Sequence, residues 1–125
     1  MRPLILRGQV WGVVRVSPDD PFLIDNTGTP RIATTDPITK TIRISTAVPI
    51  NMFDKVYLHE ATHAMIDSVA LDISPMSNEL MTWFLENHSI EIIKAVSESL
   101  GRPICIDNEC IGGDGYEDGG PRARR

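Results

Sequence analysis

Two histidines four residues apart, His59 and His63, lie inside a largely apolar run that extends from Val56 to Val69. Residues four apart share one face on an α-helix, so a helix here would place both imidazole rings on the same side, with Glu60 projecting beside them. The chain has only three histidines. Chance placement of a His-Glu-x-x-His pattern is expected in roughly one such chain in a few hundred. This helix is therefore the strongest structural prediction that the sequence makes.

The same spacing is the one by which a helix holds a single zinc ion in zinc peptidases, where the intervening glutamate acts as general base. The alternative is a surface helix that carries the pattern without a function. The apolar surroundings of the motif disfavour that alternative, because buried polar atoms need partners. The sequence thus predicts zinc bound by His59 and His63, with Glu60 as the catalytic residue.

A catalytic zinc ion takes three protein ligands and keeps a further position open for water. A predicted second helix, from about residue 77 to residue 100, offers Glu79, Glu86 and His88. At about 100° per residue, both glutamates fall in an apolar stripe and His88 falls on the opposite face. The stripe also contains Trp83, Ile90 and Ile93. An unpaired carboxylate there is costly, so we expect Glu79, in the first turn, to bind the metal, with Glu86 as the alternative and His88 as an ordinary surface or loosely packed residue.

The first half of the chain predicts strands, at residues 4–6, 9–16 and 41–45. After Pro49, Asn51 is expected to cap the first helix, with Asp54 completing a weak capping box, and this helix should run to about residue 70. Pro75 separates the two helices, and Gly101 ends the second. The predicted fold class is α+β, with a small N-terminal antiparallel or mixed sheet followed by two main helices.

The end of the chain has a different composition. From Ile106 onward, glycines are interleaved with acidic residues without periodicity, so we expect one domain over residues 1–105 and a mobile tail over residues 106–125. The spacing of these acids does not match an EF-hand calcium loop. We expect Cys105 and Cys110 to be free thiols, with a disulfide or an accessory metal site as the alternatives.

Charge and hydropathy exclude two classes of partner. The formal net charge is −5 and the pI is near 5.1, with no basic stripe before the last four residues, so no nucleic-acid-binding surface is predicted. The apolar stretch over residues 3–16 is interrupted by Arg7, Gln9 and Arg15, so it is neither the core of a signal peptide nor a membrane span. We therefore expect a cytoplasmic protein without membrane contact.

The residues after His63 exclude one group of zinc peptidases. A metzincin has glycine three residues after the second histidine and a third histidine three residues later, whereas this chain has Ile66 and Val69 there. Residues 35–45, the motif over residues 58–64 and the segment 78–80 that opens an apolar helix instead resemble the ImmA/IrrE-like metallopeptidases. The similarity is greatest to their short bacterial, prophage and phage versions. It covers about residues 30–96.

The resemblance implies a minimal zincin-like domain of the gluzincin type, in which two histidines and a glutamate from the next helix hold zinc. Those roles fall on His59, His63 and Glu79, with Glu60 as the base. The implied activity is hydrolysis of a peptide bond in a protein or peptide substrate, inside a bacterial or host cell. The gap from His63 to Glu79 is shorter than in the longer members of the family.

Several further roles are expected from the pattern. An extended substrate would pair with the strand at residues 41–45 by β-augmentation. Tyr57 and Arg43 are candidates for stabilising an oxyanion. Asp67, one turn after His63, would either orient a histidine or simply face solvent.

A second function is open at this stage. In that alternative, the chain is a non-catalytic binding or inhibitor protein of a phage or mobile element. Its zinc site is structural and stabilises the fold of a small domain. Retention of Glu60 favours catalysis over this alternative, because a purely structural site needs no base.

Overall fold

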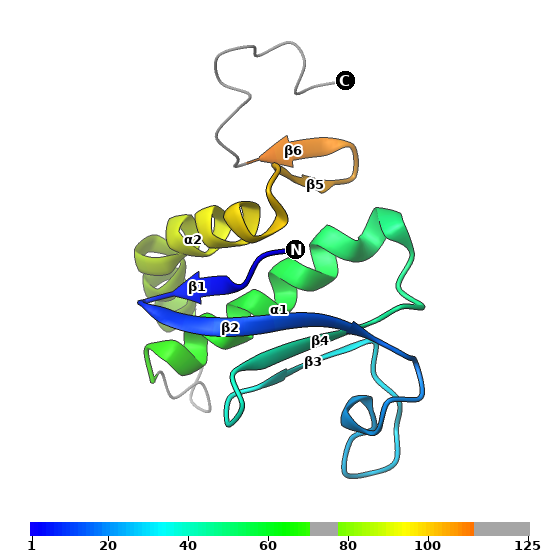
Figure 1. Ribbon diagram of the computed structural model, residues 1–125. Helices are drawn as coiled ribbons and strands as arrows, with labels where there is room; N and C mark the ends of the chain where they lie inside the picture. Colours follow the sequence, from blue (N-terminus) through cyan, green and yellow to red (C-terminus); the bar gives the residue numbers. More distant parts are fainter. Residues whose placement is uncertain (71–77, 112–125) are drawn as a thin grey trace.

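The computed structural model describes residues 1–70 and 78–111 and has an α+β fold, as predicted. Its strands β1 (Leu4–Leu6), β2 (Gln9–Val16), β3 (Ala33–Asp36) and β4 (Thr41–Ser45) form one sheet in the order β1-β2-β4-β3. β2 and β4 run parallel and the other two pairs are antiparallel, so the sheet is mixed. Helix α1 (Phe53–Ser68) lies along one face of this sheet, and α2 (Asn78–Leu100) packs against α1 and β1 (Figure 1).

The three predicted strands are confirmed at residues 4–6, 9–16 and 41–45, whereas β3 was not predicted. A two-residue turn joins β1 to β2. Both of its residues, Arg7 and Gly8, have positive φ angles, of 53° and 77°. This is the geometry of a type I′ turn, whose twist matches that of the strands. Two single-turn 3₁₀ helices, η1 (Pro21–Leu23) and η2 (Ile50–Met52), complete the connections of the N-terminal half.

A hairpin of β5 (Ile104–Ile106) and β6 (Glu109–Ile111) follows α2 and corrects two expectations. Its turn residues Asp107 and Asn108 have φ angles of 52° and 68°, again a type I′ pattern. Cys105 and Cys110 stand opposite each other on the two strands and form a disulfide, so the prediction of free thiols is wrong and the disulfide alternative is correct. Residues 106–111 therefore belong to the hairpin and not to an irregular tail. Residues 112–125 lie outside the described part of the chain.

The start of α1 differs in detail from the prediction. Met52 occupies the N-cap position without a side-chain hydrogen bond, so Asn51 does not cap the helix. Asp54 is buried and binds Arg102 and the backbone N–H of Cys105 instead of completing a capping box. The 3₁₀ turn η2 takes the place of a side-chain cap, because it continues the hydrogen-bonded backbone up to the first residue of α1.

The ends of the helices follow the sequence more closely. Gly101 has a φ of 73°, and its N–H donates to the Ser97 carbonyl at 2.9 Å, which confirms its role in ending α2. The predicted start of the second helix at about residue 77 and the predicted break at Pro75 lie outside the described residues. Within the described part of the chain, neither helix combines the length and the hydrophobicity that crossing a bilayer requires.

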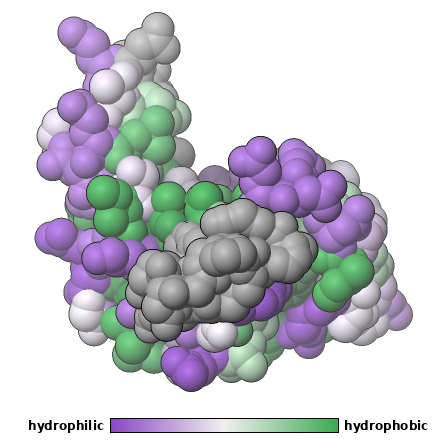
Figure 2. Space-filling model, turned by 90° about the horizontal axis from the view of Figure 1, so that it is seen from above, coloured by the Kyte–Doolittle hydropathy of each residue, from purple (hydrophilic) through white to green (hydrophobic). Residues whose placement is uncertain are grey.

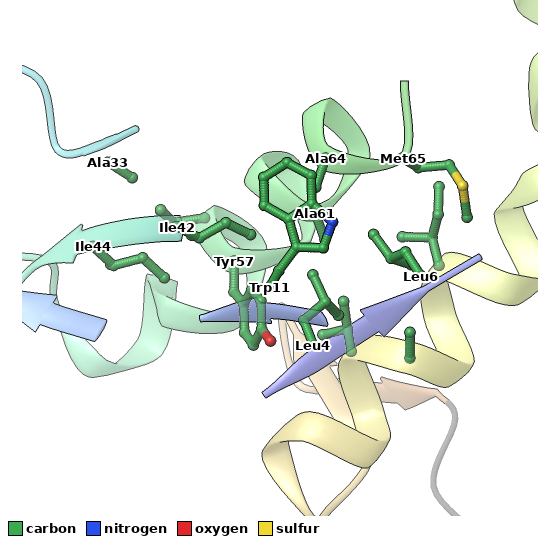
Figure 3. Close-up of a cluster of buried hydrophobic side chains, with 14 of the residues drawn as sticks. Leu4, Leu6, Trp11, Ala33, Ile42, Ile44, Tyr57, Ala61, Ala64 and Met65 are labelled. Atoms are coloured by element: carbon green, nitrogen blue, oxygen red, sulfur yellow. The ribbon is translucent and has the colours of Figure 1, made fainter. Parts of the chain in front are cut away.

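The core lies between the sheet and the two helices. Trp11 of β2 is fully buried and directed toward Ala61 and Ala64 of α1 (Figure 3). The small side chains of these alanines let the helix approach the indole closely. Other fully buried members of the cluster are Leu4, Leu6, Ile42, Ile44, Tyr57, Met65, Val96 and Ile104.

The buried face of α2 is not the one that was predicted. Trp83 and Ile90 of the predicted stripe are 46% and 68% exposed, and Glu79 and Glu86 are exposed as well. On the face seen from above in Figure 2, hydrophobic residues (green) and hydrophilic residues (purple) are interspersed. The buried stripe instead consists of Phe84, His88, Ile92, Ala95, Val96 and Ser99.

Small and hydrogen-bonding residues explain this choice of face. Ser99 accepts a 2.6 Å hydrogen bond from the Tyr57 hydroxyl and donates to the Arg2 carbonyl, which ties α2 to α1 and to the N-terminal segment. Ala95, one turn earlier, allows the close approach that these bonds need. His88 does not have the surface position that was one of its two expected placements, since the residue is 7% exposed and its ring packs against Phe84.

Candidate metal centre

Helix α1 brings His59 and His63 together as the spacing predicts. Both side chains are exposed, and their Nε2 atoms lie 3.2 Å apart. Zinc binds histidine nitrogens at about 2.0–2.1 Å in tetrahedral geometry, which separates two such nitrogens by roughly 3.3–3.4 Å. The two rings therefore already have the spacing that a shared zinc ion requires. A hydrogen bond between one protonated and one unprotonated nitrogen fits the same distance.

Glu60 lies beside this pair but is turned toward the sheet. Its side chain is 8% exposed, and its Oε1 accepts a 2.7 Å hydrogen bond from the hydroxyl of Thr35 on β3. The same hydroxyl lies 3.1 Å from the backbone carbonyl of Glu60. Thr35 thus holds both the carboxylate and the helix backbone against β3.

The three motif residues line one surface hollow of about 410 Å³. Its walls come from α1, from β3 with the residues around it, and from the η1 region. Both histidines and the Glu60 carboxylate therefore share a space large enough for an extended peptide segment. A second hollow, of about 420 Å³, shares His59 and Glu60 with the first and lies toward the start of α1.

Strand β3 borders both hollows and forms an edge of the sheet. On its other side it pairs with β4, and no further strand of the described chain pairs with it. β4, by contrast, lies between β2 and β3 and is paired on both sides. The expectation that residues 41–45 pair with a substrate is therefore wrong. The free edge beside Glu60 belongs to β3.

Asp67 lies in the same hollow, two turns beyond His59 on α1. Its carboxylate accepts a hydrogen bond from Lys40 Nζ at 3.1 Å, and both side chains of this pair are 36% exposed. The structure shows an ion pair here and no contact between Asp67 and a histidine. Asp67 therefore faces solvent, which is the second of the two roles expected for it.

The proposed third ligand is not assembled with the histidines. Within residues 1–70 and 78–111, no three His, Cys, Asp or Glu side chains stand close enough to hold a metal ion. Glu79 and Glu86 are both exposed on α2, so the argument that placed them in a buried stripe is wrong. Their assignment as ligands stays a prediction.

Neither candidate for an oxyanion donor lies in the hollows. Tyr57 is fully buried, its hydroxyl is bonded to Ser99, and burial raises the pKa of this phenol to about 12. Arg43 stacks on the ring of Phe22 at 3.9 Å from its centroid and pairs with Asp36 at 3.7 Å. Both side chains therefore have structural roles.

Thr35 is the site residue that sequence reasoning missed. Its strand is four residues long and lacks the alternation that marked residues 41–45, so the sequence contained little local signal for it. No protein-family model, curated protein or solved structure matches this chain.

Proposed function

We propose that this protein is a zinc-dependent peptidase that hydrolyses a peptide bond of a protein or peptide substrate. His59 and His63 would hold the metal, and Glu60 would act as general base. The observation that carries the proposal is the 3.2 Å separation of the two Nε2 atoms, in one hollow with the Glu60 carboxylate and beside a free strand edge. The resemblance of the sequence to the ImmA/IrrE-like metallopeptidases supports the same activity, in the cytoplasm of a bacterial or host cell.

Zinc, when bound, supplies Lewis-acid activation of water and of the peptide carbonyl. The chain supplies the proton transfers and the positioning. Glu60 takes a proton from the attacking water and gives it to the leaving amine. The hydrogen bond from Thr35 fixes one carboxylate oxygen and leaves the other for this exchange. The edge of β3 binds the substrate backbone as an added strand, which takes the role first expected of residues 41–45.

Glu79 remains the proposed third ligand and Glu86 the alternative. Both are exposed carboxylates on α2, and neither has an ion-pair partner among the residues that the structure describes. Among residues 1–70 and 78–111, metal binding by either carboxylate would therefore break no ion pair.

The exposure of the histidine pair bears on the non-catalytic alternative. A structural zinc site is closed and links separate elements of a small domain. His59 and His63 come from one helix and face an open hollow, so a metal held by them alone would link no elements. This arrangement supports a catalytic zinc site over a purely structural one.

The test combines metal binding with hydrolysis. Isothermal titration with zinc is expected to give about one site per chain, and His59→Ala or His63→Ala should abolish it. Glu60→Gln should keep zinc and the fold but lower kcat/KM on an unstructured protein substrate by at least about 100-fold. Glu98→Gln, an exposed change on α2, is the matched control and should leave both measurements unchanged.

Two outcomes would overturn parts of the proposal. Equal zinc binding by wild type and both histidine variants would remove the metal site. Hydrolysis that persists in Glu60→Gln, with zinc still bound, would remove Glu60 from the mechanism.

A further inference from the structure

The second hollow lies between the start of β3 and the first turns of α1, next to the candidate catalytic glutamate. Its floor is apolar, because Val56 and Ala33 are each only 7% exposed there. Met52 and Ile32, which are 41% and 55% exposed, extend this apolar lining toward the surface. A hollow of about 420 Å³ with such walls fits a branched aliphatic or aromatic side chain.

The rim of this hollow is positively charged. Arg31 and Lys55 both line it, and among residues 1–70 and 78–111 the one acidic side chain that lines it is Glu60. The Glu60 carboxylate is buried and bonded to Thr35, whereas Arg31 and Lys55 are both exposed, so two cations at the rim stand against one buried carboxylate. Arg31 is partly compensated by Asp25 at 3.5 Å, whereas Lys55 has no ion-pair partner in the described part of the chain. In a protein with a net charge of −5, this rim is locally positive and would attract a carboxylate.

The direction of β3 places this hollow relative to the scissile bond. The strand runs from Ala33, which lines both hollows, toward Thr35 and Pro37, which line only the hollow that contains His63, here called the metal-side hollow. Antiparallel pairing is the more stable arrangement for an added strand. A substrate bound in this way would pass the metal-side hollow first and reach the second hollow with the residues that follow the scissile bond.

We infer that the hollow lined by Val56, Ala33 and Lys55 is a specificity pocket. It takes an apolar side chain immediately after the scissile bond, and Lys55 binds a carboxylate that follows it. The inference rests on the proposed function for the position of the scissile bond. The preference for an apolar group next to a carboxylate rests on the lining residues alone.

The test measures binding separately from cleavage. Fluorescein-labelled peptides with a Gly/Ser background, amidated at the C-terminus, carry Leu-Glu, Leu-Lys or Ser-Glu at the centre. Anisotropy titrations use the zinc-loaded Glu60→Gln protein. Leu-Glu should bind about tenfold more tightly than either of the others, which corresponds to about 1.4 kcal/mol. A further peptide that ends in Leu-Gly with a free carboxylate shows whether a chain terminus serves as well as a side chain.

Reversing the charge of Lys55 shows whether this residue causes the preference for Leu-Glu over Leu-Lys. Lys55→Glu should invert the order of Leu-Glu and Leu-Lys, while Lys94→Glu, an exposed lysine on α2 outside the hollow, should leave the order unchanged. Equal binding of Leu-Glu and Leu-Lys to the unchanged pocket, or equal effects of the two lysine variants, would overturn the inference. The peptide comparison decides the matter even if a variant does not fold.

Cleavage by wild type separates this inference from the proposed function. Mass spectrometry of the same peptides should show faster cleavage of Leu-Glu, on the amino side of leucine. Preferential binding without any cleavage would contradict the proposed function while supporting the preference of the pocket. Equal cleavage of all peptides would support the proposed function and overturn the inference.

Discussion

The hydroxyl of Thr35 donates a 2.7 Å hydrogen bond to Oε1 of Glu60, between two residues that are 25 positions apart. Thr35 belongs to the edge strand β3 and Glu60 to α1. The contact therefore fixes the direction of a carboxylate on the helix relative to the strand that borders both hollows. It also gives that largely buried carboxylate a partner, without which its burial would be costly.

The first prediction concerns this bond. Thr35→Val keeps the shape and β propensity of the side chain but removes the donor. A hydrogen bond to a charged group contributes about 1.5–3 kcal/mol, so kcat/KM should fall by roughly tenfold to a hundredfold. Zinc affinity should not change, because both histidines keep their positions on α1. Steady-state hydrolysis and zinc titration measure the two effects, and Thr35→Ser should restore most of the activity.

The neighbouring residue provides a matched control. The Thr34 hydroxyl is buried and has no hydrogen-bond partner among the described residues. Thr34→Val should therefore leave hydrolysis unchanged and keep or raise the free energy of unfolding. A loss of activity in Thr34→Val equal to that in Thr35→Val would show that strand packing, and not the bond to Glu60, causes the effect.

The parts of the site that could be predicted are those that local sequence determines. The pairing of His59 and His63 follows from helical periodicity alone. The contact between Thr35 and Glu60 joins a strand to a helix, so no periodicity in either segment encodes it. β3 itself takes its register from β4, and its own four residues carry too weak a pattern to be recognised.

The face of α2 could not be chosen from periodicity for a different reason. The helix has apolar residues on more than one side, and a stripe that contains Trp83 and Ile90 is as regular as the buried one. The buried stripe has the additional bonds of Ser99 to Tyr57 and Arg2, besides the burial of Phe84, Ile92 and Val96. These partners of Ser99 are far away in the sequence, and nothing in the sequence around a serine indicates that it will be buried.

The second prediction tests the third metal ligand. If Glu79 completes the site, Glu79→Ala should weaken zinc binding by at least about tenfold and remove most of the thermal stabilisation that zinc provides. Glu86→Ala should change neither, because it is an exposed substitution away from the metal. Zinc titration and melting curves with and without zinc make the comparison.

Other results of the same experiment assign the ligand differently. The reverse pattern would make Glu86 the ligand and leave the peptidase proposal in place. Full zinc affinity in both variants would exclude a ligand from this pair of glutamates.

The third prediction concerns the link between α1 and the C-terminal hairpin. Asp54 is 4% exposed and accepts hydrogen bonds from Arg102 Nη1 and Nη2 at 2.6 and 2.8 Å, and from the N–H of Cys105 at 2.8 Å. The hydrogen bonds that Arg102 donates to the Asp54 carboxylate raise the pKa of Arg102. Arg102→Met leaves a buried carboxylate without its cation. The free energy of unfolding should fall by about 2 kcal/mol or more, even though the exposed half of the guanidinium is screened by solvent.

The pair between Lys40 and Asp67 is the comparison for this prediction. Both of its side chains are 36% exposed, so Asp67→Asn should cost no more than about 1 kcal/mol. Urea unfolding of the two variants at neutral pH gives both values. Equal losses would mean that burial of Asp54 does not strengthen its ion pair.

The last prediction concerns stability in acid and the loop before β3. The Asp25 carboxylate accepts hydrogen bonds from the Thr27 hydroxyl and from the N–H groups of Thr27 and Thr29. These bonds, of which that from the Thr27 hydroxyl has the largest effect, lower the pKa of Asp25 to about 2. Since this value is below the usual 3.8, the ionised carboxylate stabilises the folded protein above about pH 4. That contribution is lost as the pH falls from about 4 to about 2.

Asp25→Asn removes the charge but keeps an acceptor oxygen. The variant should therefore melt at a lower temperature than wild type at pH 7, and most of the difference should be lost near pH 2, where about half of the Asp25 carboxylates of folded wild type are protonated. Melting curves between pH 2 and pH 7, recorded without zinc, measure this difference. Glu98→Gln, at an exposed position on α2, should show no such difference at pH 7. A destabilisation by Asp25→Asn that persists unchanged at pH 2 would assign the effect to altered hydrogen-bond geometry in the loop and not to the charge of the carboxylate.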